Sequence, residues 1–218
     1  MSELSLPQVI VVSILPILFA ITVHEVAHGW VAKRFGDPTA QRLGRLTLNP
    51  FKHIDPIGTV LVPALLLLLK AGFLFGWARP VPVTWENLRH PKRDMVFVAI
   101  AGPAANLLMA FFWGAVAKLA TVLPASADWA AVPLQLMGEI GITINVLLMV
   151  FNLLPLPPLD GGRVAVGLLP GPLAWQLSRV EPYGFFILLG LMAFGVLWFI
   201  IQPFANFMTG LVHWVVGL

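Results

Sequence analysis

Six apolar segments alternate with short polar stretches along the chain. In order they are Leu6–Val31, Ile57–Phe75, Met95–Leu123, Leu134–Leu154, Tyr183–Ile201 and Pro203–Gly217. A helix that crosses the hydrocarbon core of a bilayer needs about 20 apolar residues; the longer segments reach that length, whereas the last is short. The pattern predicts an all-α integral membrane protein, a polytopic bundle of about five to six apolar segments in a single domain over residues 1–218.

The composition agrees with a membrane protein and narrows the chemistry. Hydrophobic residues make up 59% of the chain and charged residues 11%, whereas about a quarter of the residues in soluble proteins are charged. The net charge of +3 comes from basic residues in short loops, so it reports membrane topology and does not indicate a nucleic-acid partner. Because the chain has no cysteine, a bound metal would need His, Asp or Glu ligands.

Basic residues gather in three connections between the apolar segments. They are Lys33, Arg34, Arg42, Arg45 and Lys52, then Arg79, Arg89, Lys92 and Arg93, and finally Arg163 and Arg179. Positively charged loops favour the cytoplasmic side of a membrane. All three connections share that side if Ile57–Phe75, which Pro63 interrupts, enters the membrane and returns. We therefore predict a re-entrant segment; the alternative is an ordinary crossing helix with an imperfect charge bias.

A cluster of ionisable residues, His24-Glu25-Val26-Ala27-His28, lies inside the first apolar segment. Ionisable side chains are costly in hydrocarbon, so this cluster indicates a functional site. On a helix, His24 and His28 project from one face, where both imidazoles can bind one metal ion. Glu25 lies beside them and can move a proton to or from water at the metal. The alternative is a chance match on a surface helix, but the apolar surroundings argue against it.

A catalytic zinc site needs a third protein ligand besides His24 and His28. The candidates are Asp160, His53, Asp55, Glu139 and Asp37. Asp160 is favoured because it follows the helix-ending prolines of residues 155–158 and precedes Gly161-Gly162, which permit a sharp turn and a close approach of the backbone. The predicted topology also places it at the same cytoplasmic depth as the two histidines. Its alternative role is that of a turn residue at a helix end.

Three motifs together resemble the site-2 protease family (S2P, peptidase M50) of intramembrane zinc metalloproteases. They are HEVAH at 24–28, AGPAAN at 101–106 and NLLPLPPLDGGR at 152–163. The stretches at 49–56 and 76–83 are similar to the compact branch of that family, which lacks a PDZ or CBS domain. The resemblance implies a three-helix catalytic core made of the segments that begin at Leu6, Met95 and Leu134.

The resemblance also implies roles for individual residues. His24, His28 and Asp160 would ligate one Zn²⁺ ion, Glu25 would serve as general base and acid, and Asn152 would position the substrate backbone or stabilise the oxyanion. Many members carry a further helix before the metal-binding helix. Here the metal-binding segment comes first, so we expect the last two apolar segments to take over any gating.

The resulting hypothesis is an intramembrane zinc metalloendopeptidase. Its partners would be the lipid bilayer and a membrane-spanning or membrane-associated protein substrate, and it would be a multi-pass protein of a bacterial or archaeal cell membrane with its active site toward the cytoplasm. The alternatives are a divalent-metal transporter and a non-catalytic homologue that binds membrane proteins. The sequence leaves the oligomeric state open.

Several polar elements each allow two interpretations of their role. The stretch Trp77–Val83 is either a β-edge that pairs with the unwound substrate or a plain connecting loop. Asn106 and Asn145 either line the site or form hydrogen bonds between helices. His53 is either a supporting group for the site or a loop residue at the membrane interface.

Overall fold

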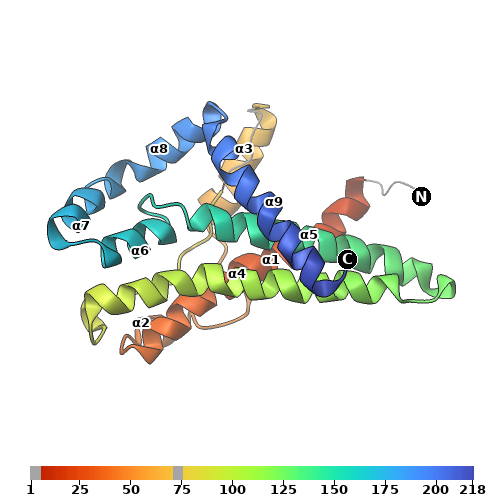
Figure 1. Ribbon diagram of the computed structural model, residues 1–218, viewed down its shortest axis with the longest axis horizontal. Helices are drawn as coiled ribbons and strands as arrows, with labels where there is room; N and C mark the ends of the chain where they lie inside the picture. The colour runs from red at the N-terminus through yellow and green to blue at the C-terminus, as the bar shows by residue number, and fades with distance from the viewer. Residues whose placement is uncertain (1–5, 71–75) are drawn as a thin grey trace.

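The computed structural model describes residues 6–70 and 76–218, and within them it contains helices and no β-strand. In this part of the chain, four helices are long and apolar enough to cross a bilayer. They are α1 (Leu6–Arg34), α4 (Pro91–Thr121), α5 (Asp128–Asn152) and α9 (Val196–Val216). They form an elongated bundle (Figure 1). The prediction of an all-α polytopic membrane protein is confirmed.

The shorter helices connect and cover this bundle. They are α2 (Thr39–Arg42), η1 (Pro50–Lys52), η2 (Pro56–Leu61), α3 (Val62–Leu68), η3 (Trp85–Asn87), η4 (Ala125–Ala127), α6 (Asp160–Leu168), α7 (Gly171–Ser178) and α8 (Glu181–Ala193). Figure 1 shows α2, α6 and α7 at one end of the bundle, on the left of the view.

Helices α1 and α4 pack side by side in antiparallel directions. His24 of α1 forms a hydrogen bond with Asn106 of α4, whereas the later residue His28 forms one with the earlier residue Val98. Buried polar contacts of this kind join helices in apolar surroundings, where water cannot compete for the polar groups. This packing brings the middle of α4 against the ionisable cluster of α1.

Helices α4 and α5 are also antiparallel and approach each other closely. A Cβ atom added at Gly138 of α5 would lie 2.5 Å from the Cβ atom of Ala117 and 2.7 Å from its backbone nitrogen. Small residues at such contacts let two helix backbones come together. Further along the same pair, the Asn106 side chain donates a hydrogen bond to Asn145, and both side chains are fully buried.

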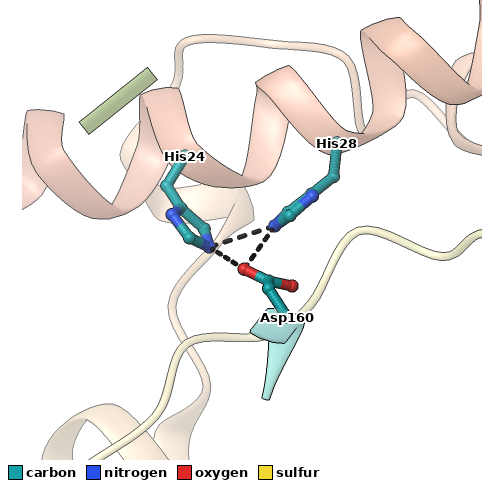
Figure 2. A group of neighbouring side chains, drawn as sticks. All are labelled: His24, His28 and Asp160. Carbon is teal, nitrogen blue, oxygen red and sulfur yellow. Dashed lines mark hydrogen bonds and ion pairs between the residues drawn. The ribbon is translucent and has the colours of Figure 1, made fainter. Parts of the chain in front are cut away.

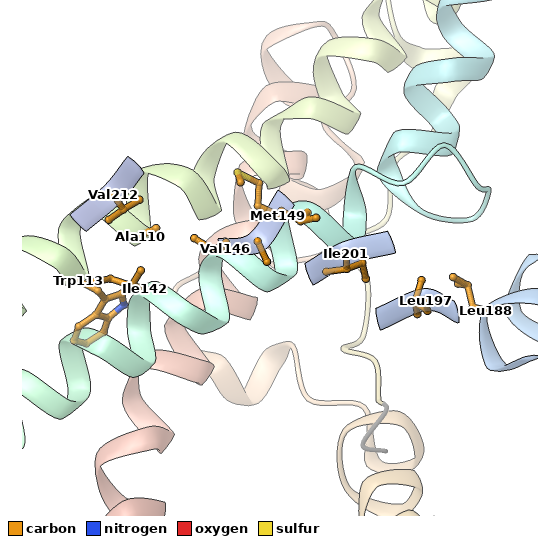
Figure 3. Close-up of a cluster of buried hydrophobic side chains, with 11 residues drawn as sticks. Ala110, Trp113, Ile142, Val146, Met149, Leu188, Leu197, Ile201 and Val212 are labelled. Atoms are coloured by element: carbon orange, nitrogen blue, oxygen red, sulfur yellow. The ribbon is translucent and has the colours of Figure 1, made fainter. Parts of the chain in front are cut away.

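The main hydrophobic core lies between α4, α5 and α9 (Figure 3). Its buried residues are Ala110, Trp113, Ile142, Val146, Met149, Val150, Leu188, Leu197, Ile201, Ala205 and Val212. Leu188 belongs to α8, which therefore packs on the same core as α9. This core holds the carboxyl-terminal helices against α5, the helix that leads to Asp160.

The boundary between the last two apolar segments is not where the sequence predicted it. The break was expected at Gln202-Pro203, but α8 ends at Ala193 and α9 begins at Val196 and continues through Pro203. Gly195 adopts a φ of +70°, a left-handed conformation that glycine adopts without steric cost and that ends a helix. The last helix is therefore a full 21 residues long, and the segment before it is the short one.

Within the described residues, the second apolar segment forms no helix long enough to cross a bilayer, which agrees with a re-entrant segment; its place in the membrane stays a prediction. Elements η2 and α3 contain 6 and 7 residues, so together they extend about 20 Å, less than the ~30 Å of a hydrocarbon core. The Trp77 N–H donates to Gly58 O at 3.1 Å, and Thr59 Oγ1 donates to Trp77 O at 2.8 Å. The chain thus comes back to the start of its own short helix. Residues 71–75 of the predicted segment lie outside the described residues.

The β-edge predicted for Trp77–Val83 is not a strand of any sheet in the residues that the structure describes. The stretch is extended, but its backbone is already engaged. The Arg79 N–H donates to His53 O at 2.9 Å, and the carbonyls of Arg79 and Pro80 accept hydrogen bonds from Arg45. Pro80 has no N–H to donate. Within the described chain the stretch is a connecting segment, and its pairing with a substrate stays a prediction.

The close approach at Gly138 leads to a stability prediction. Gly138→Ala should lower the free energy of unfolding by about 1–3 kcal/mol, because the added methyl group overlaps Ala117 and separates α4 from α5. Thermal or denaturant unfolding in detergent measures the change. Gly210→Ala in α9 is the matched control, since no heavy atom lies within 4 Å of its added Cβ. Equal stability of the Gly138 variant and the wild type would contradict the packing.

Candidate metal centre

Three side chains from distant parts of the chain meet at one point (Figure 2). His24 and His28 project from the same face of α1 because they are separated by about one helical turn. The Nε2 atoms of these two imidazoles lie 3.0 Å apart, and each lies 3.3 Å from Asp160 Oδ2. His24 and Asp160 are each 8% exposed, so the group is shielded from solvent.

Asp160 reaches the histidines because the chain turns sharply after α5. It is the first residue of α6, where the positive end of the helix dipole favours a carboxylate. A Cβ atom at Gly161 would lie 2.3 Å from Leu153 O, so only glycine allows α6 to begin this close to the end of α5. The predicted role of the glycine pair in a close backbone approach is confirmed.

The hydrogen-bond network assigns a proton to the Nδ1 atom of each imidazole. His28 Nδ1 lies 2.7 Å from Val98 O, which can only accept. His24 Nδ1 lies 2.6 Å from Asn106 Oδ1. In neutral imidazoles with this tautomer, the two Nε2 atoms turn lone pairs toward Asp160, and Asp160 Oδ2 is buried with no hydrogen-bond partner in the described part of the chain.

The charge state of Asp160 agrees with this arrangement. Burial raises the pKa of its carboxyl group, but the two neighbouring imidazoles lower it by more, so the pKa falls below its usual range. Asp160 is therefore a carboxylate. Together the three residues present one negative charge and two lone pairs to the same small space.

The residues present fit a zinc ion. Ligand atoms about 2.0 Å from a tetrahedral zinc ion lie about 3.3 Å from one another, close to the separations found here. Nitrogen and carboxylate oxygen are the donors that zinc takes when cysteine is absent. Within the described residues, His24, His28 and Asp160 form the only group of three or more His, Asp or Glu side chains that could hold a metal ion.

Glu25 lies next to the three-ligand group but is not part of it. Its Oε2 atom accepts a hydrogen bond of 2.7 Å from the Val81 N–H. The extended segment that follows α3 thus reaches the carboxylate on α1 through its backbone. Nothing in the sequence pattern pointed to this contact, because a backbone N–H leaves no trace in the choice of residue.

Asn106 lines the site and also joins helices, whereas Asn145 joins helices through Asn106. The Asn106 side chain donates to Ala20 O at 3.1 Å and to Asn145 Oδ1 at 2.9 Å, which directs its oxygen toward His24. Asn145 in turn donates to Gly141 O at 2.8 Å. The two amides join three helices and orient the imidazole of His24. An outer residue that accepts from a metal-binding histidine fixes its tautomer and its ring position.

The glycine-proline pair in α4 contributes to the site as well as to packing. A Cβ atom at Gly102 would lie 2.4 Å from His28 Nε2 and 2.5 Å from His24 Cε1. Any side chain at this position would therefore displace the imidazoles. Pro103, the next residue, has no N–H to donate within the helix. The sequence pattern did not reveal the contact of Gly102 with the histidines.

The other third-ligand candidates are engaged elsewhere. His53 is 2% exposed and its Nε2 atom binds Thr47 O. Asp55 caps η2, Asp37 accepts four hydrogen bonds from residues 39, 84 and 87, and Glu139 pairs with His213. None of them lies in the three-ligand group.

Asn152 lies at the end of α5, eight residues before Asp160. Its side-chain amide donates to Leu148 O at 2.9 Å, within its own helix. The residue is half-buried and belongs to the segment that leads to the site. A substrate-binding role for Asn152 stays a prediction.

Comparison with known proteins agrees with this geometry. The chain is 40% identical over 195 residues to "Putative zinc metalloprotease YwhC" of Bacillus subtilis, and this match covers 88% of this chain and 85% of YwhC. It is 29% identical over 175 residues to Rip2 of Mycolicibacterium smegmatis, which bears the same description, and this match covers 80% of this chain and 64% of Rip2. Rip2 of Mycobacterium tuberculosis is 32% identical over 144 residues, 66% of this chain and 52% of that protein.

The chain belongs to this family of zinc metalloproteases. No family model and no solved structure matches it. The protease is a multi-pass membrane protein, and zinc is the metal that its family implies and its three-ligand group fits.

The contact between Asn106 and His24 leads to a prediction about metal affinity. Asn106→Ala should weaken zinc binding by about 10–100-fold, because the His24 ring loses the acceptor that orients it. Competition with a chromogenic chelator measures the affinity. Asn145→Ala leaves the acceptor in place and should cause a smaller loss. Wild-type affinity in a folded Asn106→Ala protein would exclude this role.

Proposed function

We propose that the protease is an intramembrane zinc endopeptidase, of the site-2 type, that cleaves a membrane-spanning or membrane-associated protein. The observation that best supports this is the depth of the three-ligand group in the bundle. His24 and His28 lie in the apolar helix α1, about 15 and 9 Å along its axis from Arg34 at its basic end. A peptide bond that reaches them must itself lie near or below the membrane surface.

In this proposal His24, His28 and Asp160 hold one Zn²⁺ ion, which when bound polarises a carbonyl and acidifies water. Glu25 accepts a proton from the water molecule that attacks the scissile carbonyl carbon. As the C–N bond breaks, Glu25 gives the proton to the leaving nitrogen, so one carboxyl and one amino terminus result. The Val81 N–H holds the Glu25 carboxylate in place for this transfer.

Asn152 is the proposed contact with the substrate backbone. A substrate helix must unwind locally before its scissile carbonyl is accessible, and unwinding leaves backbone groups that need hydrogen-bond partners. The amide group of Asn152 donates to Leu148 O, and its side-chain oxygen can accept from a substrate N–H. Because the backbone of residues 79–81 is engaged, Asn152 is better suited to this role than that segment.

We further propose that the site faces the cytoplasmic side of a bacterial or archaeal cell membrane. The Arg89 N–H donates to Phe35 O, so the end of α1 and the start of α4 lie at one level. Both ends carry basic residues: Lys33 and Arg34 on one side, Lys92 and Arg93 on the other. Basic residues concentrate on the cytoplasmic side of membrane proteins, and these lie at the end nearer the metal group.

The ligand assignment predicts the metal content of variants. His24→Ala, His28→Ala and Asp160→Asn should each reduce bound zinc well below one ion per chain, because each removes one of three donors. Mass spectrometry of the purified protein for zinc measures the content. His90→Ala is the matched control, since its side chain is 71% exposed and lies outside the group. Full zinc content in all three site variants would refute the assignment.

The proton-transfer role predicts a separation of binding from catalysis. Glu25→Gln should retain zinc but lose cleavage of a transmembrane test substrate by about 10²-fold or more, because an amide cannot accept the proton of water. Zinc content and single-turnover cleavage in detergent or liposomes measure the two effects. Glu86→Gln, an exposed glutamate in η3, is the control and should cleave normally. Undiminished cleavage by Glu25→Gln would exclude it as the base.

A further inference from the structure

A basic pocket is lined in part by the extended segment whose Val81 N–H contacts Glu25. Its volume is about 640 Å³. Three cationic side chains line it, Arg45, Lys52 and Arg79, together with Phe51, Pro80 and Pro82. No carboxylate is among its lining residues, so the pocket presents three positive charges without a negative one.

Arg45 is the most unusual of the three cations. It is only 9% exposed, and its Nη2 atom donates to Arg79 O at 2.7 Å and to Pro80 O at 3.3 Å. Its Nε atom is buried with no hydrogen-bond partner in the described residues. A buried charge with an unused donor is costly unless an anion compensates it.

The protein itself does not supply that anion. In the residues that the structure describes, the ion pairs join histidines to carboxylates, and none includes Arg45, Lys52 or Arg79. Burial and then the charge of Arg79 lower the pKa of the Arg45 guanidinium, which nevertheless stays protonated, while Glu25 raises it. The pocket is therefore a cationic site without a directly paired anion, since Glu25 acts on Arg45 only through its charge and not through a contact.

We propose that this pocket binds the phosphate group of an anionic ligand, either an acidic phospholipid headgroup or a free phosphate compound. A guanidinium and an ammonium group are the usual partners of phosphate, and the planar donors of arginine suit its oxygens. The exposed ring of Phe51, 78% accessible, lies beside Lys52 at the rim of the pocket. An apolar ring next to basic groups suits the boundary between lipid headgroups and acyl chains.

The pocket is also connected to Glu25 through the backbone of the extended segment. Arg45 binds the carbonyls of Arg79 and Pro80, and the next residue, Val81, donates its N–H to Glu25. A phosphate bound to Arg45 would therefore contact the same short segment that positions the Glu25 carboxylate. Binding itself does not depend on the proposed proteolysis.

The test uses the zinc-loaded full chain in a neutral detergent. Phosphatidylglycerol is titrated and bound lipid is followed by native mass spectrometry, with phosphatidylcholine as the uncharged comparison; inorganic phosphate is titrated separately by calorimetry. The double variant Lys52→Ala with Arg79→Ala removes two pocket charges whose side chains make no other described contact. Lys33→Ala with Arg42→Ala removes two exposed charges outside the pocket and is the matched control.

We expect the pocket variant to lose at least about tenfold in affinity for phosphatidylglycerol or for phosphate, and the control to change less than about twofold. Binding of phosphatidylglycerol without phosphate would identify a lipid headgroup as the ligand, and binding of phosphate alone would identify a free phosphate compound. Binding of neither probe would overturn the proposal. An equal loss in both double variants would overturn it as well, since attraction would then be nonspecific.

Discussion

Two imidazole nitrogens and one carboxylate oxygen meet within 3.3 Å, and with both Nδ1 protons engaged elsewhere, neutral imidazoles direct three lone pairs toward one another. Such a group repels itself strongly in buried surroundings, where the effective dielectric is low and water cannot screen the charges. A divalent cation converts the repulsion into attraction, which is why these three side chains can share one small space. Neighbouring groups maintain this arrangement of donor atoms. Asn106 and the Val98 carbonyl accept hydrogen bonds from the Nδ1 atoms and keep both Nε2 atoms directed inward.

Helix α4 packs against both α1 and α5 and so holds them in the relative positions that the site requires. It contributes no metal ligand, yet Asn106, Val98 and Gly102 surround the imidazoles that α1 carries. Its other side packs on α5, the helix whose end turns to present Asp160. The packing of α1 against α4 therefore determines the orientation of the two imidazole rings. The packing of α4 against α5 determines the position of the Asp160 carboxylate.

The segment that follows α3 links this centre to the basic pocket. Its backbone donates to Glu25 on one side, and on the other it accepts from Arg45, which lines the basic pocket. The prolines of this segment predict its extended shape, but they do not reveal the hydrogen bonds that its backbone forms. A β-edge needs free N–H and C=O groups, and several of those in this stretch are already bonded to the Glu25 and Arg45 side chains or to the His53 carbonyl. The misplaced break at Gln202-Pro203 has a similar cause, because a proline interrupts an apolar helix less reliably than a glycine in the left-handed conformation.

The sequence by itself determined the class of the protein and the metal-binding chemistry. Apolar length is a property of each segment alone, and the spacing of His24 and His28 brings two imidazoles together on any helix. Asp160 could be favoured from its turn but not chosen, since five acidic or histidine residues were candidates. Only the tertiary structure decided which of them meets the histidines, and only it revealed the contacts of Asn106, Val81 and Arg45. These contacts join residues far apart in the chain, so local patterns of hydrophobicity and spacing contain no information about them.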